Sequence, residues 1–492
     1  MSPVLILGCV GAYFALLLSV AWWAGRGATN AGYFLGDKQS PWWLIAFGVI
    51  GDTLSGVTFI SVPGEVGTRK FAYLQVVLGY VLGYAIIATV LLPLYYRLQL
   101  TSIYSYLGWR FDAWVQRVGS FFFLLSRTLG AAARLYLAVA VFQHFVFDGL
   151  GIPFAVTAAV ILLLMLAYTW QGGIKSLVWT DLLQSGFLLL GLVLSLAALG
   201  QQLGLGPMAL AQKVADSPLS QVFFWDWRAP NHFLKQFLSG ALIAVVMTGL
   251  DQNSMQKNLT CRTLRDAQKN IFAFVPVLVV VNLLFLALGA LLFEVATTRE
   301  IVIPDRTDLL FPTLALQHLG GFAALVFVLG LTAATFNSAD SVLTTLTTSF
   351  CFDFLGLDRR TDLDERGRTR IRHRVHIAFA GVLLAVILGF WAWSQNSVIS
   401  LVLKMAGYTY GPLLGLFALG LFTRVQIGGP RSIAVCMTAP LLCAILDHNS
   451  KSWLNGYVFS QELLLLNGIV TGAGLLLFCR RPFIDHPTKI GT

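Results

Sequence analysis

Long apolar stretches alternate with short polar or charged stretches along the whole chain. A helix that crosses a lipid bilayer needs about 20 mostly apolar residues. Stretches of that kind lie at 4–24, 42–65, 73–97, 116–146, 153–170, 177–200, 233–253, 271–293, 322–350, 373–394, 398–423, 431–447 and 462–479. This pattern predicts an all-α polytopic membrane protein with about thirteen transmembrane helices.

Few polar residues lie between the predicted helices, so we expect one membrane domain over residues 1–492. The run at 4–24 has no basic segment before it and no clean cleavage site, which predicts a retained helix rather than a signal peptide. The loop at 201–232 is long enough for a short surface helix. The alternation of aromatic and polar residues at 102–114 favours a helix at the membrane surface.

The composition supports a membrane protein and predicts its orientation. The chain is 57% hydrophobic and 11% charged, with a mean hydropathy of +0.76, whereas soluble domains carry about 25% charged residues. The net charge of +10 is concentrated in particular loops, so it does not indicate a nucleic-acid partner. The positive-inside rule places the N-terminus outside and the C-terminus in the cytoplasm. The basic loops hold Arg97, Arg110, Arg117, Lys257, Arg262, Arg265, Lys269, the arginines at 359–374 and the basic residues at 480–489; Arg69 and Lys70 are exceptions on the outer side.

The stretch GDTLSGVT at 51–58 interrupts the second apolar run with glycine, hydroxyl and carboxyl groups. Each glycine lowers helix propensity by about 1 kcal/mol. A helix that unwinds inside a membrane is tolerated only where its free backbone groups line a cavity or bind a ligand, as in transporters that bind sodium or anionic groups there. A packing face of small residues is the alternative, but Asp52 favours a broken helix at a functional site.

A second polar stretch, LTAATFNSADSVLTTLTTSFCFDF, lies at 331–354. Asn337, Asp340, Ser341 and Thr344 follow the spacing i, i+3, i+4, i+7 and therefore share one helix face. That face offers the oxygen ligands that hard cations prefer. Hydroxyl groups that join neighbouring helices are the alternative, worth about 0.6 kcal/mol each, but they do not account for Asp340.

Asp181, within GGIKSLVWTDLLQ at 172–184, needs a cation or a proton if it is buried in the membrane. Arg127 and Arg134 are seven residues apart in SRTLGAAARLYL and lie on one helix face. Two interpretations stay open for them. Either one of these arginines pairs with Asp181, or one binds a substrate carboxylate through two hydrogen bonds.

Nothing in the sequence indicates catalysis. The histidines have no HExxH spacing, and GxSxG, GKS/T and GxGxxG motifs are absent. The six cysteines are scattered without a CxxC pair, so neither a metal site nor a disulfide framework is indicated. The polar stretch at 249–261 and the glycine-rich stretch at 405–424 do not indicate a particular function by themselves.

The segments GDTLSGVTFISVPG, GGIKSLVWTD, NSADSVLTTLTTSFCFDF and AGYTYGPLLGLF, in this order, resemble the sodium:solute symporter family. The resemblance covers most of the chain and implies the LeuT-like fold, with two inverted five-helix repeats. These repeats would lie at 42–200 and 233–423, after one preceding helix and before two C-terminal helices at 431–479. The breaks at GDTLSG and before DQNSMQ would open the two repeats and mark a binding site near the midplane.

The resemblance also implies ion sites with Na+ as the coupling ion. The main sodium site would use three backbone carbonyls and two polar side chains, from Gly51, Leu54, Ala334, Asn337 and Ser338. A second site, found in some members, would comprise Asn337 with Asp181, Asp340 and Ser341. Asp340 stands where hydroxyl residues are usual, and two close carboxylates rarely both ionise. That site is therefore expected to bind either a second sodium ion or a proton.

For the solute, the resemblance is to the sialic acid transporters of the family, which present hydroxyl groups and an arginine for the carboxylate. The matching residues are Thr53, Ser55, Thr58 and Arg134. Gln75 falls near the position where sugar-transporting members have a glutamate. Proline transporters have an acidic residue that aligns with Thr53, so we do not expect a proline carrier.

We therefore expect a sodium-coupled symporter, not an enzyme, that imports an organic anion or a sugar-acid-like solute by alternating access. Its partners would be the small-molecule solute and the lipid bilayer, with no obligate protein partner. The alternatives are a proton-coupled carrier that uses Asp181 and Asp340 and a membrane sensor with a transporter fold. The lack of targeting peptides fits a multi-pass protein of a bacterial inner membrane.

Overall fold

The structure is a computed structural model that describes residues 3–170, 172–227, 229–393, 405–457, 459 and 462–477. Within these ranges the chain is mostly helical, and its β-structure is limited to one isolated bridge between Ser40 and Cys261. The prediction of an all-α protein is confirmed for this part of the chain.

The helices follow one another with short connections. They are α1 (Pro3–Gly25), α2 (Asn30–Leu35), α3 (Trp42–Thr53), α4 (Gly56–Arg69), α5 (Tyr73–Ile86), α6 (Leu92–Arg97), α7 (Ser105–Arg110), α8 (Ala113–Phe142), α9 (Phe154–Thr169), α10 (Ile174–Leu203), α11 (Pro207–Ala215), α12 (Phe233–Ala244), α13 (Gln252–Asn258), α14 (Leu264–Thr298), α15 (Leu310–Thr313), α16 (Gly321–Ser349), α17 (Glu365–Trp393), α19 (Gly411–Phe422), α20 (Pro430–Trp453) and α21 (Leu463–Leu477). Single π-helical turns extend five of them, at η2 (Ile87–Leu91), η3 (Gln143–Phe147), η6 (Val245–Gly249), η8 (Leu314–His318) and η9 (Phe350–Phe354).

Eight helices of the described ranges are long and apolar enough to cross a membrane, or up to ten if each of two bent pairs is one span. Three shorter apolar helices, α9, α19 and α21, overlap the other predicted spans. A multi-pass membrane protein is thus supported, while the count of about thirteen, the inverted repeat and the orientation stay predictions. Residues 394–404 comprise the last residue of one predicted span, the loop at 395–397 and the start of the next span, and they lie outside the described residues.

The first predicted break is present between α3 and α4, which meet at 55°. The backbone leaves the helical region at Leu54 (φ −94°, ψ 77°), and the last hydrogen bond of α3 runs from Leu54 N to Ile50 O at 2.9 Å. Directly after the break, Gly56 lies so close to α16 that a Cβ atom there would clash with Thr335 Oγ1. The break therefore brings helix-end carbonyl groups, which have no partner in the helix, next to α16.

The second predicted break is present where α12 and η6 turn by 70° into α13. Asp251 caps α13, because its carboxylate accepts hydrogen bonds from the backbone N–H groups of Asn253 and Ser254 at 2.9 and 3.3 Å. A carboxylate at a helix N-terminus is a favourable cap. The polar residues 252–258 thus form a short helix that is buried inside the protein.

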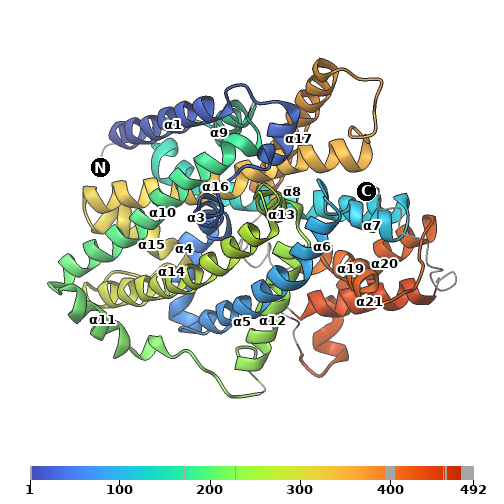
Figure 1. Cartoon of the computed structure of the whole chain (residues 1–492). Coiled ribbons are helices and arrows are strands. Elements are labelled where there is room, and N and C mark those ends of the chain that lie inside the picture. The colour runs from blue at the N-terminus through green and yellow to red at the C-terminus, as the bar shows by residue number, and fades with distance from the viewer. Residues whose placement is uncertain are drawn as a thin grey trace.

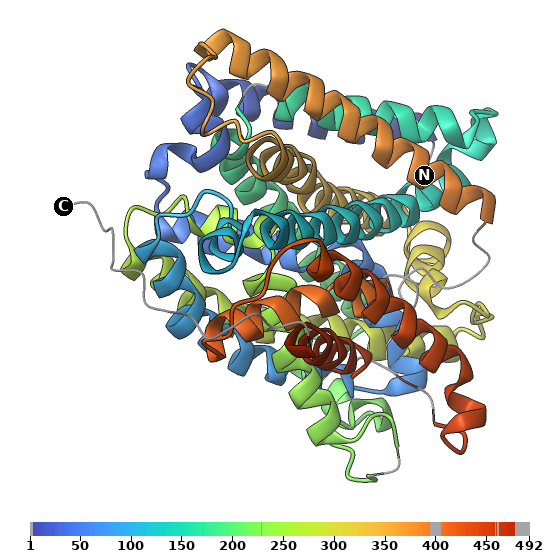
Figure 2. The same cartoon turned by 90° about the vertical axis from the view of Figure 1, so that its right-hand side faces the viewer.

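Helix α16 lies at the centre of the molecule, and every one of its residues from Gly330 to Ser349 is buried. Helices α3, α4, α8 and α10 pack on it, and α13 approaches it from the second break (Figure 1). The turned view places α1, α9 and α17 together along the upper edge, with α20 and α21 in the lower half (Figure 2). Both breaks therefore contact the polar face of α16.

The loop and surface predictions are partly confirmed. The loop at 201–232 carries α11, the expected short surface helix, followed by a 3-10 turn at Pro218–Ser220. The segment 102–114 contains α7, but α7 covers only Ser105–Arg110 before α8 begins.

Candidate functional site

A cavity of about 210 Å³ lies between the two breaks. Four of the five predicted solute residues line it, namely Thr53, Ser55, Thr58 and Arg134. Three tyrosines of α5 form another part of the wall, and the hydroxyl groups of Tyr73 and Tyr80 are 3.5 Å apart. The second break contributes Met247, Thr248 and Ser254. The cavity thus joins hydroxyl groups, aromatic rings and a guanidinium group in one space.

The two arginines of α8 differ in their partners. Arg127 Nε lies 2.6 Å from Asp251 Oδ2, and Tyr410 donates a hydrogen bond to the same oxygen at 2.9 Å. Within the part of the chain that the structure describes, no hydrogen bond or ion pair joins Arg134 to another residue. Arg127 is therefore neutralised at the second break, whereas Arg134 lines the cavity without a direct partner among the described residues.

Two of the predicted main sodium residues, Gly51 and Asn337, lie together where α3 ends against α16. Gly51 N donates to Ser185 Oγ of α10 at 3.1 Å, and a Cβ atom on Gly51 would lie only 2.5 Å from Asn337 Nδ2. Ser338 follows on the same turn of α16, and its hydroxyl donates to Thr335 O at 3.1 Å. The carbonyls of Gly51 and Leu54 stand at the break itself, beyond the last hydrogen bond of α3.

Asn337 has an oxygen that no protein group satisfies. Its Nδ2 donates to Asp181 O at 3.2 Å and to Ser185 Oγ at 3.3 Å, while its Oδ1 is buried without a hydrogen-bond partner among the described residues. Buried polar atoms normally have a partner. An orphaned amide oxygen beside the carbonyls at a helix end is a donor set that fits sodium. Ala334, whose carbonyl belongs to the predicted set, is fully buried in α16 one turn before.

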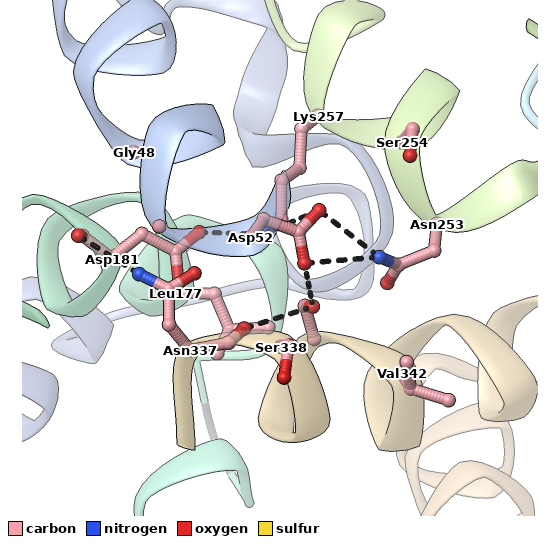
Figure 3. Close-up of polar contacts among 12 residues, drawn as sticks. Gly48, Asp52, Leu177, Asp181, Asn253, Ser254, Lys257, Asn337, Ser338 and Val342 are labelled. Atoms are coloured by element: carbon pink, nitrogen blue, oxygen red, sulfur yellow. Dashed lines mark hydrogen bonds and ion pairs between the residues drawn. The ribbon is translucent and has the colours of Figure 1, made fainter. Parts of the chain in front are cut away.

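A buried lysine joins the two breaks through two aspartates (Figure 3). Lys257 Nζ of α13 lies 2.8 Å from Asp181 Oδ2 of α10 and 3.5 Å from Asp52 Oδ2 at the first break. The side chains of Lys257 and Asp181 are 2% and 1% exposed. Asp52 also accepts hydrogen bonds from Asn253 Nδ2 at 3.2 Å and from Ser341 Oγ at 3.2 Å. These contacts connect α3, α10, α13 and α16.

Asp340 lies in the same polar region but has neutral partners. Its carboxylate accepts hydrogen bonds from Tyr168 Oη at 2.9 Å, Gln184 Nε2 at 3.2 Å and the backbone of Ser341 at 2.5 Å. The structure thus separates the roles of the predicted second-site residues. Asp181 has the lysine, Asp340 has neutral donors, and the Ser341 hydroxyl is directed to Asp52.

One prediction is wrong, and one alternative that the sequence left open for Asp181 is excluded. Lys257 is not a loop cation, because it lies inside α13 and is 1% exposed. Asp181 pairs with neither Arg127 nor Arg134, because its partner is Lys257. The signal in the sequence was the spacing of Asn253 and Lys257, which are four residues apart and share a helix face directly after a break.

Gln75 does not line the cavity. Its Nε2 donates to Asn231 O at 3.0 Å and to Ala72 O at 3.3 Å, and its Oε1 accepts from Phe224 N at 3.4 Å. The side chain therefore fastens the loop at 201–232 to the start of α5. Gln75 is therefore not among the proposed solute residues.

Comparisons with known proteins give a consistent result. The chain matches the Sodium:solute symporter family over residues 33–429. It is 25% identical over 473 residues to the sodium/sialic acid symporter SiaT of Proteus mirabilis. This alignment covers 93% of this chain and 92% of that protein. It is 26% identical to the sodium/sialic acid symporter NanT of Aliivibrio fischeri, over 84% of this chain and 82% of that protein.

A more distant relative and one solved structure complete the comparison. The chain is 24% identical to the human sodium-coupled monocarboxylate transporter 1, over 85% of this chain and 67% of that protein. The fold is similar to that of a solved structure described as the substrate-bound outward-open state of a Na+-coupled sialic acid symporter. The TM-score is 0.81 at 20% identity, over 96% of this chain and 97% of that one.

Proposed function

The chain belongs to the sodium:solute symporter family, and on this premise we propose that it imports a small organic anion together with sodium by alternating access. Its relatives are transporters, which points to transport rather than to an enzyme activity. The solute class is a carboxylate of the sugar-acid type. Sialic acid is the first candidate, because two relatives are sialic acid symporters.

The observation that carries this proposal is the guanidinium of Arg134, which lines the cavity without a hydrogen bond or ion pair to another described residue. Arg134 is half-buried, and a charge that is partly withdrawn from water gains from a partner of opposite sign, so this part of the cavity favours a ligand group that brings a negative charge. A guanidinium binds a carboxylate through two parallel hydrogen bonds. The hydroxyl groups of Ser55 and Thr58 offer hydrogen bonds to the rest of the solute, and the tyrosines of α5 offer an aromatic wall.

Sodium would be coupled to the solute through the first break. The proposed main site takes carbonyl oxygens from α3 and side-chain oxygens from Asn337 and Ser338 of α16, so a bound ion holds the break against α16. Thr53 and Ser55 flank Leu54 and line the cavity. An ion that orders Leu54 therefore also orders two solute contacts. By thermodynamic linkage, sodium then raises the affinity for the solute and the solute raises the affinity for sodium by the same factor.

Thermal stability of the purified protein in detergent tests the proposal. We expect a higher melting temperature in sodium chloride than in potassium chloride, because a ligand that binds only the folded state stabilises it. Sialic acid, other sugar acids, monocarboxylates, neutral sugars and amino acids are then screened in both salts. A solute of the proposed class should add stability in sodium and add less or none in potassium.

Two variants locate the effect. Ser338→Ala should weaken the response to sodium, and Arg134→Gln should abolish the response to the carboxylate while the response to sodium remains. A melting temperature that is equal in sodium and potassium but changes with pH would refute sodium coupling and favour the proton-coupled alternative. Stabilisation by neutral sugars that Arg134→Gln leaves intact would refute the anionic solute.

A further inference from the structure

Lys257 is the feature that the proposed function does not use. It stands on α13 just after the second break, and its ammonium group lies between Asp181 and Asp52, at 2.8 and 3.5 Å (Figure 3). Lysine is almost never fully buried unless it is paired. Here the ammonium group of Lys257 is buried against the Asp181 carboxylate, which the predicted second cation site would use as a ligand.

The remaining members of the predicted second site are also occupied. Asp340 accepts three hydrogen bonds, from Tyr168, Gln184 and the backbone of Ser341. The Ser341 hydroxyl donates to Asp52 at 3.2 Å, which links it to the same carboxylate that Lys257 contacts. The Oδ1 atom of Asp181 is buried without a hydrogen-bond partner among the described residues. The backbone oxygen of Asp181 accepts a hydrogen bond from Asn337, which belongs to the proposed main site. The residues therefore fit one sodium ion and a lysine better than two sodium ions.

Electrostatics lead to the same result. The ammonium group already supplies one positive charge to Asp181, and a sodium ion on the same carboxylate would lie within a few ångströms of it. Like charges repel strongly at such distances when water is excluded. Displacement of the lysine would leave a buried ammonium group without its partner, which is also costly.

We propose that Lys257 is a built-in cation that takes the place of a second sodium ion, so that the protein binds one sodium ion. The inference rests on the proposed sodium-coupled function. A tethered ammonium group cannot leave with the solute, so it adds no charge to the ions and solute that are transported in one cycle. One sodium ion and one monocarboxylate carry no net charge together. Transport of a monocarboxylate should therefore be electroneutral, whereas two sodium ions would make it electrogenic.

Equilibrium binding of radioactive sodium to the purified full chain tests the count directly. We expect one ion per protein in the native chain and two in Lys257→Met, because the substitution leaves Asp181 without its cation. The double variant Lys257→Met/Asp181→Asn should return to one, because it removes the carboxylate as well. Lys175→Met is the matched control: its ammonium group lies 3.3 Å from Asp37 at a site where both side chains are about one-third exposed, and it should bind one ion.

The native chain also decides the question without any variant. In proteoliposomes loaded with potassium, uptake driven by a sodium gradient should be unchanged when valinomycin sets a negative interior. Two bound sodium ions in the native chain, or uptake that a negative interior accelerates, would overturn the inference. So would a folded, monodisperse Lys257→Met that still binds one ion. The absence of any sodium-specific binding would instead overturn the proposed function on which the inference rests.

Discussion

The buried ion pair between Arg127 and Asp251 holds the second break, and Arg127→Met should destabilise the protein strongly. Asp251 is fully buried, and Arg127 Nε lies 2.6 Å from its carboxylate. Removal of one partner from a buried pair costs about 3–5 kcal/mol. Tyr410 and two backbone N–H groups stay bound to Asp251. We therefore expect a loss near the lower end of the range, at about 3 kcal/mol.

The free energy of unfolding can be measured by titration with sodium dodecyl sulfate in mixed micelles, followed by circular dichroism. The matched control is Lys213→Met, because Lys213 and Glu294 form a pair of similar length, 2.8 Å, whose side chains are 47% and 38% exposed. Exposed pairs contribute about 0.2–1 kcal/mol. Arg127→Met/Asp251→Asn should recover part of the loss, because no unpaired carboxylate remains. Equal losses in the two single variants, or no recovery in the double variant, would refute the reasoning.

Two further predictions follow from particular contacts. Gly56→Ala should destabilise the protein by about 1–3 kcal/mol, because its Cβ atom would clash with Thr335 Oγ1. Gly186→Ala of α10 has open space around that atom and should be neutral or stabilising; equal melting temperatures would contradict this account. Gln75→Ala should leave the KM for the solute unchanged, because Gln75 lies outside the cavity, and should make the loop at 221–227 more sensitive to limited proteolysis. A raised KM with normal proteolysis would return Gln75 to the solute site.

The sequence predicted those features that depend on the order of residues along one helix. Apolar run length predicted the spans, and a cluster of glycine and polar residues predicted the break at 51–58. The four-residue spacing of oxygen-bearing side chains predicted the polar face of α16. Each of these signals comes from a single segment, so no knowledge of its neighbours is needed.

The partner of Asp181 could not be predicted in the same way. Lys257 follows an apolar run and precedes several basic residues, which is the pattern of a loop that sets membrane topology. Only the 70° turn before α13 directs its side chain inward, toward α10. Ser185, which contacts both Gly51 and Asn337, was missed for a similar reason. A lone serine on an apolar helix gives no sign of which helices meet there.

The aspartate within GDTLSGVT is explained by the directions in which successive residues point at a helix end. Side chains one residue apart diverge by about 100° around the axis. Gly51 therefore faces Asn337, Asp52 faces Lys257 and Asn253 of the second break, and Thr53 lines the cavity. One turn of backbone contacts the proposed ion site, the other break and the proposed solute at the same time, so a movement of this turn must alter all three. Asp52 also borders the cavity, but its carboxylate is already paired with Lys257 and Asn253. A carboxylate at position 53 would lack these partners and would offer Arg134 an internal counter-charge. We expect Thr53→Asp to weaken binding of a carboxylate solute by that competition, whereas Thr53→Asn, which has nearly the same shape without the charge, should weaken it much less. Equal losses in these two variants, measured as the solute-dependent rise in melting temperature, would show that the shape of residue 53 and not its charge decides the affinity.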